Sequence, residues 1–125
     1  MKVCVVGLGN MGSAVLSVLS ADFEVYGCNH EDDVNEKLAA CGAFIIAVKP
    51  QSFDELVDSI KLNLSGKLAI SIMAGVTLEK LALKLGTEKV VRTIPNLPLK
   101  VGMSLTPWIS SKSLSPEEKT FVKAI

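Results

Sequence analysis

Short apolar runs alternate with longer amphipathic segments along the whole chain. The short runs are rich in β-branched residues and predict strands, whereas apolar residues spaced three to four apart predict helices. The expected strands lie near 2–6, 24–28, 43–48, 67–72 and 89–94, with a weaker one near 103–107. The expected helices lie near 11–20, 34–41, 52–62 and 77–85. This repeated β-then-α order predicts an α/β fold, with a mainly parallel sheet covered by helices on both faces.

Two expected helix starts carry a serine three residues before a glutamate. Ser52 precedes Glu55, and Ser115 precedes Glu118. Such pairs predict capping boxes, in which the hydroxyl and the carboxylate each bind a backbone N–H that the helix leaves unpaired. Pro116 follows the second serine, at the first helical position, where its missing N–H costs nothing.

The expected helix near residue 115 lacks the ending that the helix at 77–85 has. Gly86 follows that earlier helix, where a glycine closes the last turn in the left-handed conformation. The chain stops at Ile125, about two turns beyond Ser115, and no such glycine precedes that point. We therefore expect residues 1–125 to form one domain whose last helix is truncated at 125, and a further domain to be absent from this chain.

The composition is that of a folded protein outside the membrane. Hydrophobic residues make up 49% of the chain and charged residues 21%, which excludes a disordered chain. The apolar runs have only four to five residues, far fewer than the roughly 20 that cross a bilayer. The N-terminus passes directly into a glycine loop without the apolar core of a secretory signal. We expect a cytoplasmic protein.

The charge and the cysteines exclude several kinds of partner. The chain has 13 basic and 13 acidic residues, so no overall field attracts nucleic acid or a membrane surface. Any phosphate must be bound locally. Cys4, Cys28 and Cys41 are widely spaced, which is neither a zinc pattern nor a disulfide framework. We predict no metal and expect each thiol to be a small buried hydrophobe.

A glycine loop follows the first expected strand. Gly7, Gly9 and Gly12 form the pattern GxGxxG directly before the first expected helix. In a βαβ unit the first glycine permits the turn, the second lets the backbone approach a diphosphate, and the third lets the helix pack on the strand. The helix start adds free N–H groups and a partial positive charge. The placement favours dinucleotide binding in a Rossmann-type fold over an ordinary structural turn.

The end of the second expected strand bears on the choice of dinucleotide. An NAD-selective domain usually places a carboxylate there for the ribose 2′-hydroxyl, but here Asn29 and His30 follow the strand. Neither repels a 2′-phosphate, so NADP is favoured and NAD stays open. Glu31 to Asp33 follow closely, and no arginine offers a phosphate partner. His30 contacts the ribose or its phosphate, or is a solvated loop residue.

Four separated stretches strengthen the interpretation. They are VGLGNMGSA at 6–14, AVKPQ at 47–51, SIMAGVTLEKL at 71–81 and VRTIPNLPLKVGMS at 91–104. In this order they resemble the motifs of the pyrroline-5-carboxylate reductase family, and the last three are much more specific than the glycine loop. The resemblance covers nearly the whole chain and implies the N-terminal NADP-binding domain of such a reductase.

The resemblance also implies the site residues. It places Lys49 and Pro50 beside the nicotinamide, where the alternative is a turn leading into the helix at Ser52. It places Asn96 beside the nicotinamide and the substrate pocket, where the alternative is a rigid turn. No catalytic residue is assigned. The implied cofactor-binding residues are Val6, Gly7, Leu8, Gly9, Asn10, Met11, Gly12, Asn29, His30, Asn35, Ala47, Val48, Lys49, Pro50, Ile72, Met73, Ala74 and Asn96.

The chain also departs from the family pattern. Leu97 stands where the pattern has threonine, and Met73 and Leu99 are larger than the usual small residues. The segment from 29 to 43 is short and lacks most of a second helix and a following strand. This shortening affects the side where the family binds adenosine.

The resemblance implies hydride transfer from NADPH to the C=N carbon of 1-pyrroline-5-carboxylate, giving L-proline. The family's substrate-binding groups and its dimer or higher oligomer contacts belong to a helical C-terminal domain. We therefore expect this chain alone to bind the cofactor without turnover. The alternatives are a related NAD(P)- or F420-linked oxidoreductase of another small substrate, and a non-catalytic NADP-sensing module.

Overall fold

A six-stranded sheet forms the centre of the computed structural model, which describes residues 2–93, 108–110 and 114–123. The strands are β1 Lys2–Val6, β2 Glu24–Cys28, β3 Ala43–Ile46, β4 Leu68–Ser71, β5 Val90–Thr93 and β6 Trp108–Ser110. Their order in the sheet is β2-β1-β3-β4-β5-β6. The first five are parallel and β6 pairs antiparallel with β5. The mainly parallel sheet is confirmed; β6 was not predicted, and the strand expected at 103–107 lies outside the described residues.

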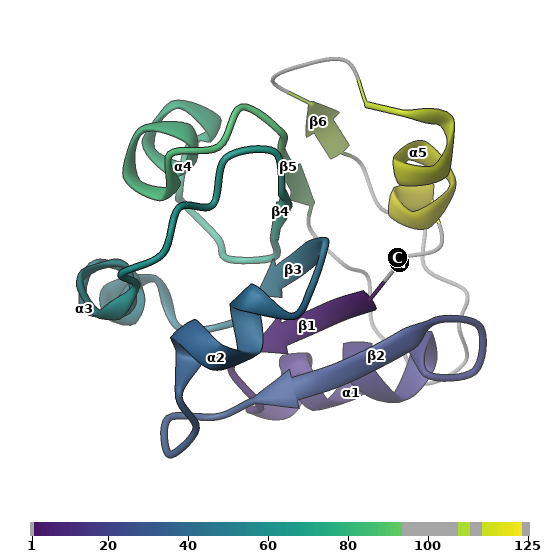
Figure 1. Ribbon diagram of the computed structural model, residues 1–125, viewed down its shortest axis with the longest axis horizontal. Helices are drawn as coiled ribbons and strands as arrows, with labels where there is room; N and C mark the ends of the chain where they lie inside the picture. The colour runs from purple at the N-terminus through teal and green to yellow at the C-terminus, as the bar shows by residue number, and fades with distance from the viewer. Residues whose placement is uncertain (1, 94–107, 111–113, 124–125) are drawn as a thin grey trace.

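Helices cover both faces of this sheet. They are α1 Asn10–Leu19, α2 Val34–Ala39, α3 Phe53–Ser59, α4 Leu78–Leu85 and α5 Pro116–Lys123, with a 3-10 turn η1 at Pro50–Ser52. The apolar residues of α2, α3 and α4 belong to one core cluster, and those of α1 and α5 to another. In Figure 1, α3 and α4 accordingly lie to the left of the strands and α5 to the right. The doubly wound fold is confirmed.

Successive residues of each strand enter opposite core clusters. In β1, Cys4 and Val6 pack beneath α2 to α4, whereas Val3 and Val5 pack beneath α1 and α5. Both faces are therefore buried, which is why the strands are continuous apolar runs without polar alternation. The three cysteines are buried and unpaired, as predicted.

The helix ends confirm one sequence signal and correct another. Gly86 closes α4 with φ of 70°, and its N–H donates to the carbonyl of Ala82. The capping box predicted at Ser52 and Glu55 does not form: Ser52 makes no side-chain cap bond. It is instead the last residue of η1, and the next backbone N–H, that of Phe53, donates to the Pro50 carbonyl. The preceding turn thus takes over part of the role that the serine hydroxyl was expected to have.

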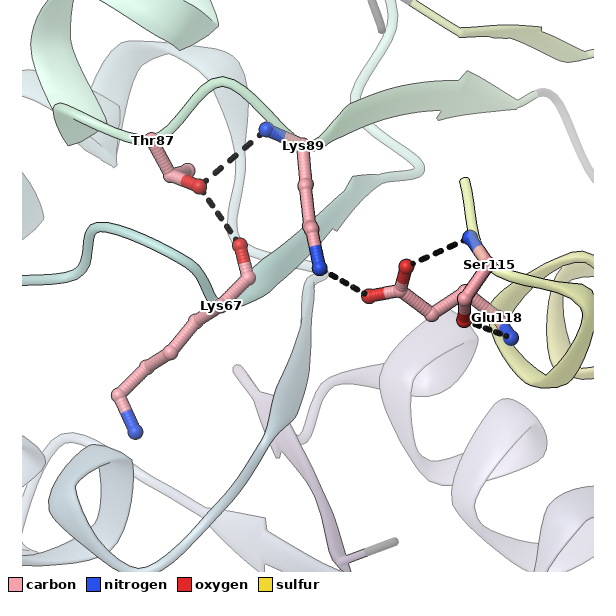
Figure 2. A network of polar contacts seen from close by, with 5 residues as sticks. All are labelled: Lys67, Thr87, Lys89, Ser115 and Glu118. Carbon is pink, nitrogen blue, oxygen red and sulfur yellow. Dashed lines mark hydrogen bonds and ion pairs between the residues drawn. The ribbon is translucent and has the colours of Figure 1, made fainter. Parts of the chain in front are cut away.

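The second predicted capping box does form and fixes α5. The Ser115 N–H donates to Glu118 Oε1 at 3.0 Å, and the Glu118 N–H donates to Ser115 Oγ at 3.1 Å. Figure 2 shows the other carboxylate oxygen of Glu118 facing Lys89, whose Nζ lies 3.2 Å away. Phe121 also meets the ring of Phe23 edge-on, with centroids 4.9 Å apart. Helix α5 is thus tied to β5 by charge and to the α1 layer by packing.

The chain between β2 and β3 is short, as the sequence indicated. Helix α2 has six residues, and the described sheet has no strand outside β2. From β1 the chain moves to β2 on one side and then crosses to β3 on the other. The direction of winding therefore reverses between β1 and β3, and ligands of open α/β sheets bind at such a switch point, outside the carboxyl ends of the strands.

Candidate functional site

The carboxyl ends of β1, β2 and β3 are joined by backbone hydrogen bonds that continue beyond the strands. The Gly7 N–H donates to the Cys28 carbonyl at 2.9 Å, and the Ala47 N–H donates to the Val6 carbonyl at 2.8 Å. The segment that leaves β1 is thus held between the ends of its two neighbours. This fixes the glycine loop at the switch point of the sheet.

The three loop glycines have three different surroundings. Gly7 has φ of 94°, and a Cβ there would lie 3.0 Å from Val48, so only glycine suits this turn. A Cβ on Gly12 would overlap the Gly7 carbonyl oxygen, so α1 packs on the loop only without a side chain there. A Cβ on Gly9 would meet nothing within 4 Å, and its φ of −72° suits any residue. Gly9 therefore borders open space, and the fold itself does not require a glycine there.

Helix α1 begins at this loop without a side-chain cap. Gly9 is its N-cap residue, and no acidic residue stands in the first turn. The Ser13 hydroxyl does not cap the helix either, because it donates to the Leu8 carbonyl at 2.9 Å. An uncapped helix start presents backbone N–H groups and about half a positive charge to a neighbouring anion.

A cavity of about 870 Å³ opens beside the loop. Its wall comes from the ends of β1 and β2, from the β2–α2 turn, and from α3. Eight of the predicted cofactor-binding residues line it: Val6, Gly7, Leu8, Gly9, Asn29, His30, Asn35 and Val48. The structure thus brings the glycine loop and the second-strand end to one hollow, with Gly9 and Asn29 lying 20 residues apart in the sequence.

The turn from β2 to α2 is held by its own side chains. Asp32 Oδ2 accepts the Asn29 N–H at 3.0 Å, and Asn29 Oδ1 accepts the Glu31 N–H at 2.8 Å. Asp33 caps α2 by accepting the N–H groups of Asn35 and Glu36. The outer end of the cavity is therefore a fixed surface.

Asn35 lies in the cavity wall but also has a structural role. Its amide nitrogen donates to the Ser59 carbonyl at 3.0 Å, and its Oδ1 accepts the Lys61 N–H. These bonds tie α2 to the end of α3. Its contact with the cofactor stays a prediction, and its side-chain amide already has two partners.

Other predicted residues do not line the cavity. Lys49 and Pro50 are exposed directly after β3. Beyond β4, Met73 is buried and offers a ligand only its backbone, whereas Ala74 is exposed. The full set of described but non-lining residues is Asn10, Met11, Gly12, Ala47, Lys49, Pro50, Ile72, Met73 and Ala74. Asn96 lies outside the described residues.

Sequence reasoning missed part of the wall. The carboxylates of Glu31, Asp32 and Asp33 line it, and so does Glu55 of α3. The first three stand within five residues of β2 and were noted only as neighbours of the strand end. Glu55 carries no local signal, because only the packing of α3 beside α2 brings it to the cavity. The other lining residues that were missed are Cys28, Val34, Ser52, Leu56 and Ser59.

Burial disfavours the thiolate form of Cys28, which lines this cavity, and of Cys4 in β1. Burial raises the pKa of Cys28, and burial raises that of Cys4 to about 12. Both side chains are therefore protonated near neutral pH. Among the described residues no group of histidine, cysteine and carboxylate side chains could hold a metal, and no helix is long and apolar enough to cross a membrane.

Comparison with known proteins agrees with this geometry. The family model described as the NAD binding domain of 6-phosphogluconate dehydrogenase matches residues 2–91. A pyrroline-5-carboxylate reductase from Aquifex aeolicus is 31% identical over 100% of this chain and 54% of its own length. The Escherichia coli reductase of that name is 29% identical over 94% of this chain and 52% of its own length.

A solved structure is also similar over nearly the whole chain. It is the Plasmodium falciparum pyrroline carboxylate reductase with NADP bound. The two share 29% identity and a TM-score of 0.83, over 98% of this chain and 52% of the other. The chain thus spans about half the length of these relatives.

Proposed function

Because the chain belongs to the NAD-binding domain family named for 6-phosphogluconate dehydrogenase, we propose that its cavity holds a nicotinamide dinucleotide with the diphosphate at the glycine loop. The observation that carries this proposal is the space at Gly9, beside an uncapped helix start. A bare backbone facing an open hollow has no role in the packing of this fold, whereas a diphosphate needs both features.

The sheet order supports a course for the whole ligand. The carboxyl ends lie in the order β2, β1, β3, β4 along one edge, so a ligand centred on the loop reaches β2 on one side and β3 on the other. We propose that the adenosine half lies toward Asn29, His30 and Asn35. The nicotinamide half then lies toward Lys49, Pro50 and the segment 72–74, with Asn96 as a residue of the substrate pocket.

We further propose that the protein is a reductase of the C=N bond of 1-pyrroline-5-carboxylate, forming L-proline. The support is the named activity of the curated relatives and the four sequence stretches shared with that family. When bound, the reduced nicotinamide supplies the hydride. This chain's residues hold the diphosphate, orient the dinucleotide along the sheet edge and leave its nicotinamide end beside the backbone after β3.

The sequence favoured NADP and left NAD open, and the relative with NADP bound supports a dinucleotide of this NAD(P) class. We propose that other residues, outside this cavity, make the substrate-binding and subunit contacts in the longer relatives. We accordingly propose that residues 1–125 alone bind the dinucleotide without turnover. Proline formation from 1-pyrroline-5-carboxylate by the purified chain would contradict that part.

Replacing Gly9 by aspartate tests the diphosphate site directly. Aspartate is a favoured N-cap residue, so its carboxylate should cap α1, and the stability of the chain should stay the same or rise. The same carboxylate would occupy the anion position and repel a diphosphate. We expect the dissociation constant for NADH or NADPH, measured by fluorescence titration, to rise at least about 100-fold, or about 2.7 kcal/mol.

The Gly9→Asn variant is the matched control, because it caps and fills the same space without charge. It should weaken binding less than Gly9→Asp does. Unchanged dinucleotide affinity in a folded Gly9→Asp variant would show that the diphosphate does not lie at this loop, and the proposal would then be withdrawn.

A further inference from the structure

The cavity wall carries a marked charge imbalance. Glu31, Asp32, Asp33 and Glu55 line it, and in the described part of the chain no lysine or arginine does. Three of these carboxylates belong to the turn directly after β2, the end at which the adenosine ribose is proposed to lie. The wall that would surround a 2′-phosphate is therefore acidic.

Two lysines on the neighbouring segments make contacts elsewhere. The Nζ of Lys37, on α2, lies 5.8 Å from the centre of the Tyr26 ring. The Nζ of Lys61, after α3, donates to the Asp58 carbonyl at 2.9 Å. Neither residue lines the cavity, so neither is placed to bind a phosphate there directly.

Several backbone donors in and after this turn already have partners. The N–H groups of Asn29 and Glu31 donate to the side chains of Asp32 and Asn29, and the Asp32 N–H donates to the Asn29 carbonyl. The N–H groups of Asn35 and Glu36 in α2 donate to the Asp33 carboxylate. A phosphate at this place would have to compete with acceptors that the chain itself supplies.

Resting on the proposed function, we propose that this site selects NAD(H) over NADP(H), the reverse of the preference expected from Asn29 and His30. A ribose 2′-hydroxyl donates a hydrogen bond, which carboxylates accept, whereas a 2′-phosphate adds negative charge among them. Glu31 and Asp32 are the specificity-determining residues. The sequence pattern missed them because they stand two and three residues beyond the usual position at the strand end.

The test compares the dissociation constants of NADH and NADPH for the purified chain by fluorescence titration. We expect NADH to bind at least about tenfold more tightly at low salt, and the ratio to shrink in about 0.3 M salt as the repulsion is screened. The double variant Glu31→Gln with Asp32→Asn should lower the ratio about fivefold or more. The Asp32→Asn substitution keeps a side-chain oxygen that accepts the Asn29 N–H, so the turn is retained.

Two further variants keep the outcome clear. Glu79→Gln removes one exposed carboxylate from α4, away from the cavity, and should leave the ratio unchanged. Glu31→Gln alone should lower the ratio in part, even if the double variant folds poorly. Equal or tighter binding of NADPH by the unaltered chain overturns the inference, as does a ratio that the double variant leaves unchanged. Binding of neither dinucleotide would instead remove the proposed function.

Discussion

At the scale of single residues, the fold requires two of the three loop glycines, and the third leaves room for a ligand. Gly7 is required by its backbone conformation and Gly12 by the close approach of α1 to the loop. Gly9 meets neither requirement. One motif therefore combines two positions that determine stability with one position that determines binding, and substitutions at the three should have different consequences.

Gly12→Ala is expected to destabilise the chain by about 3 kcal/mol, because overpacking of a rigid contact forces the backbone to shift. The added methyl group would overlap the Gly7 carbonyl oxygen, and the nearby Ala47 Cβ leaves little room for relief. Urea unfolding at neutral pH measures the loss. Gly9→Ala, at an open position in the same loop, is the control and should change the free energy of unfolding by less than about 1 kcal/mol.

At the scale of elements, the two serine–glutamate pairs show what a local signal can and cannot predict. Ser115 directly follows Leu114, which belongs to no helix or strand, and it forms the full capping box. Ser52 has the same spacing to its glutamate, but Pro50 begins a 3-10 turn directly before it. A turn that leads into a helix already pairs some of the first N–H groups, so spacing alone does not predict the cap.

Helix α5 provides a pH-dependent test. Burial raises the pKa of Glu118, but the hydrogen bonds from Ser115 and Lys89 outweigh burial and hold its pKa below the ordinary value of 4.5. A lowered folded-state pKa contributes stability above the unfolded value, and this contribution is lost as pH falls through the folded one. Glu118→Gln keeps the capping spacing and loses the charge pair with Lys89. We expect it to cost about 1 kcal/mol at pH 7.

The difference between the original chain and Glu118→Gln should shrink as urea unfolding is repeated from pH 7 down to below pH 4.5. Lys89→Met removes the other half of the pair and should give a similar loss at pH 7. If Glu118→Gln lowers the free energy of unfolding by the same amount over this whole pH range, the carboxylate charge does not hold α5 against β5.

At the scale of the whole molecule, the sequence predicted the sheet better than the cavity. Strands such as Lys2–Val6 were located where they occur, because an apolar run buried on both faces has a clear local pattern. The cavity wall instead combines Asn29, Asn35 and Glu55 from separate elements. These residues come together because α2 and α3 pack side by side, and no local spacing in the sequence encodes that packing. The contribution of Glu55 to the acidic wall therefore emerged only from the fold.

The three buried thiols report the opening of the whole molecule. Cys4, Cys28 and Cys41 lie in the same core cluster, and burial raises the pKa of each, so alkylation requires opening of the structure. We expect iodoacetamide to modify them far more slowly than in the urea-unfolded chain, as followed by mass spectrometry.

A dinucleotide at about 100 times its dissociation constant should slow the modification of Cys4 and Cys41 about 100-fold, corresponding to about 2.7 kcal/mol of stabilisation. Cys28 lines the cavity and a ligand covers it directly, so Cys4 and Cys41 carry the test. If either reacts at the unfolded rate without ligand, the core beneath α2 to α4 is not closed as described. If both are protected but the dinucleotide does not slow their reaction, the ligand does not bind the folded chain.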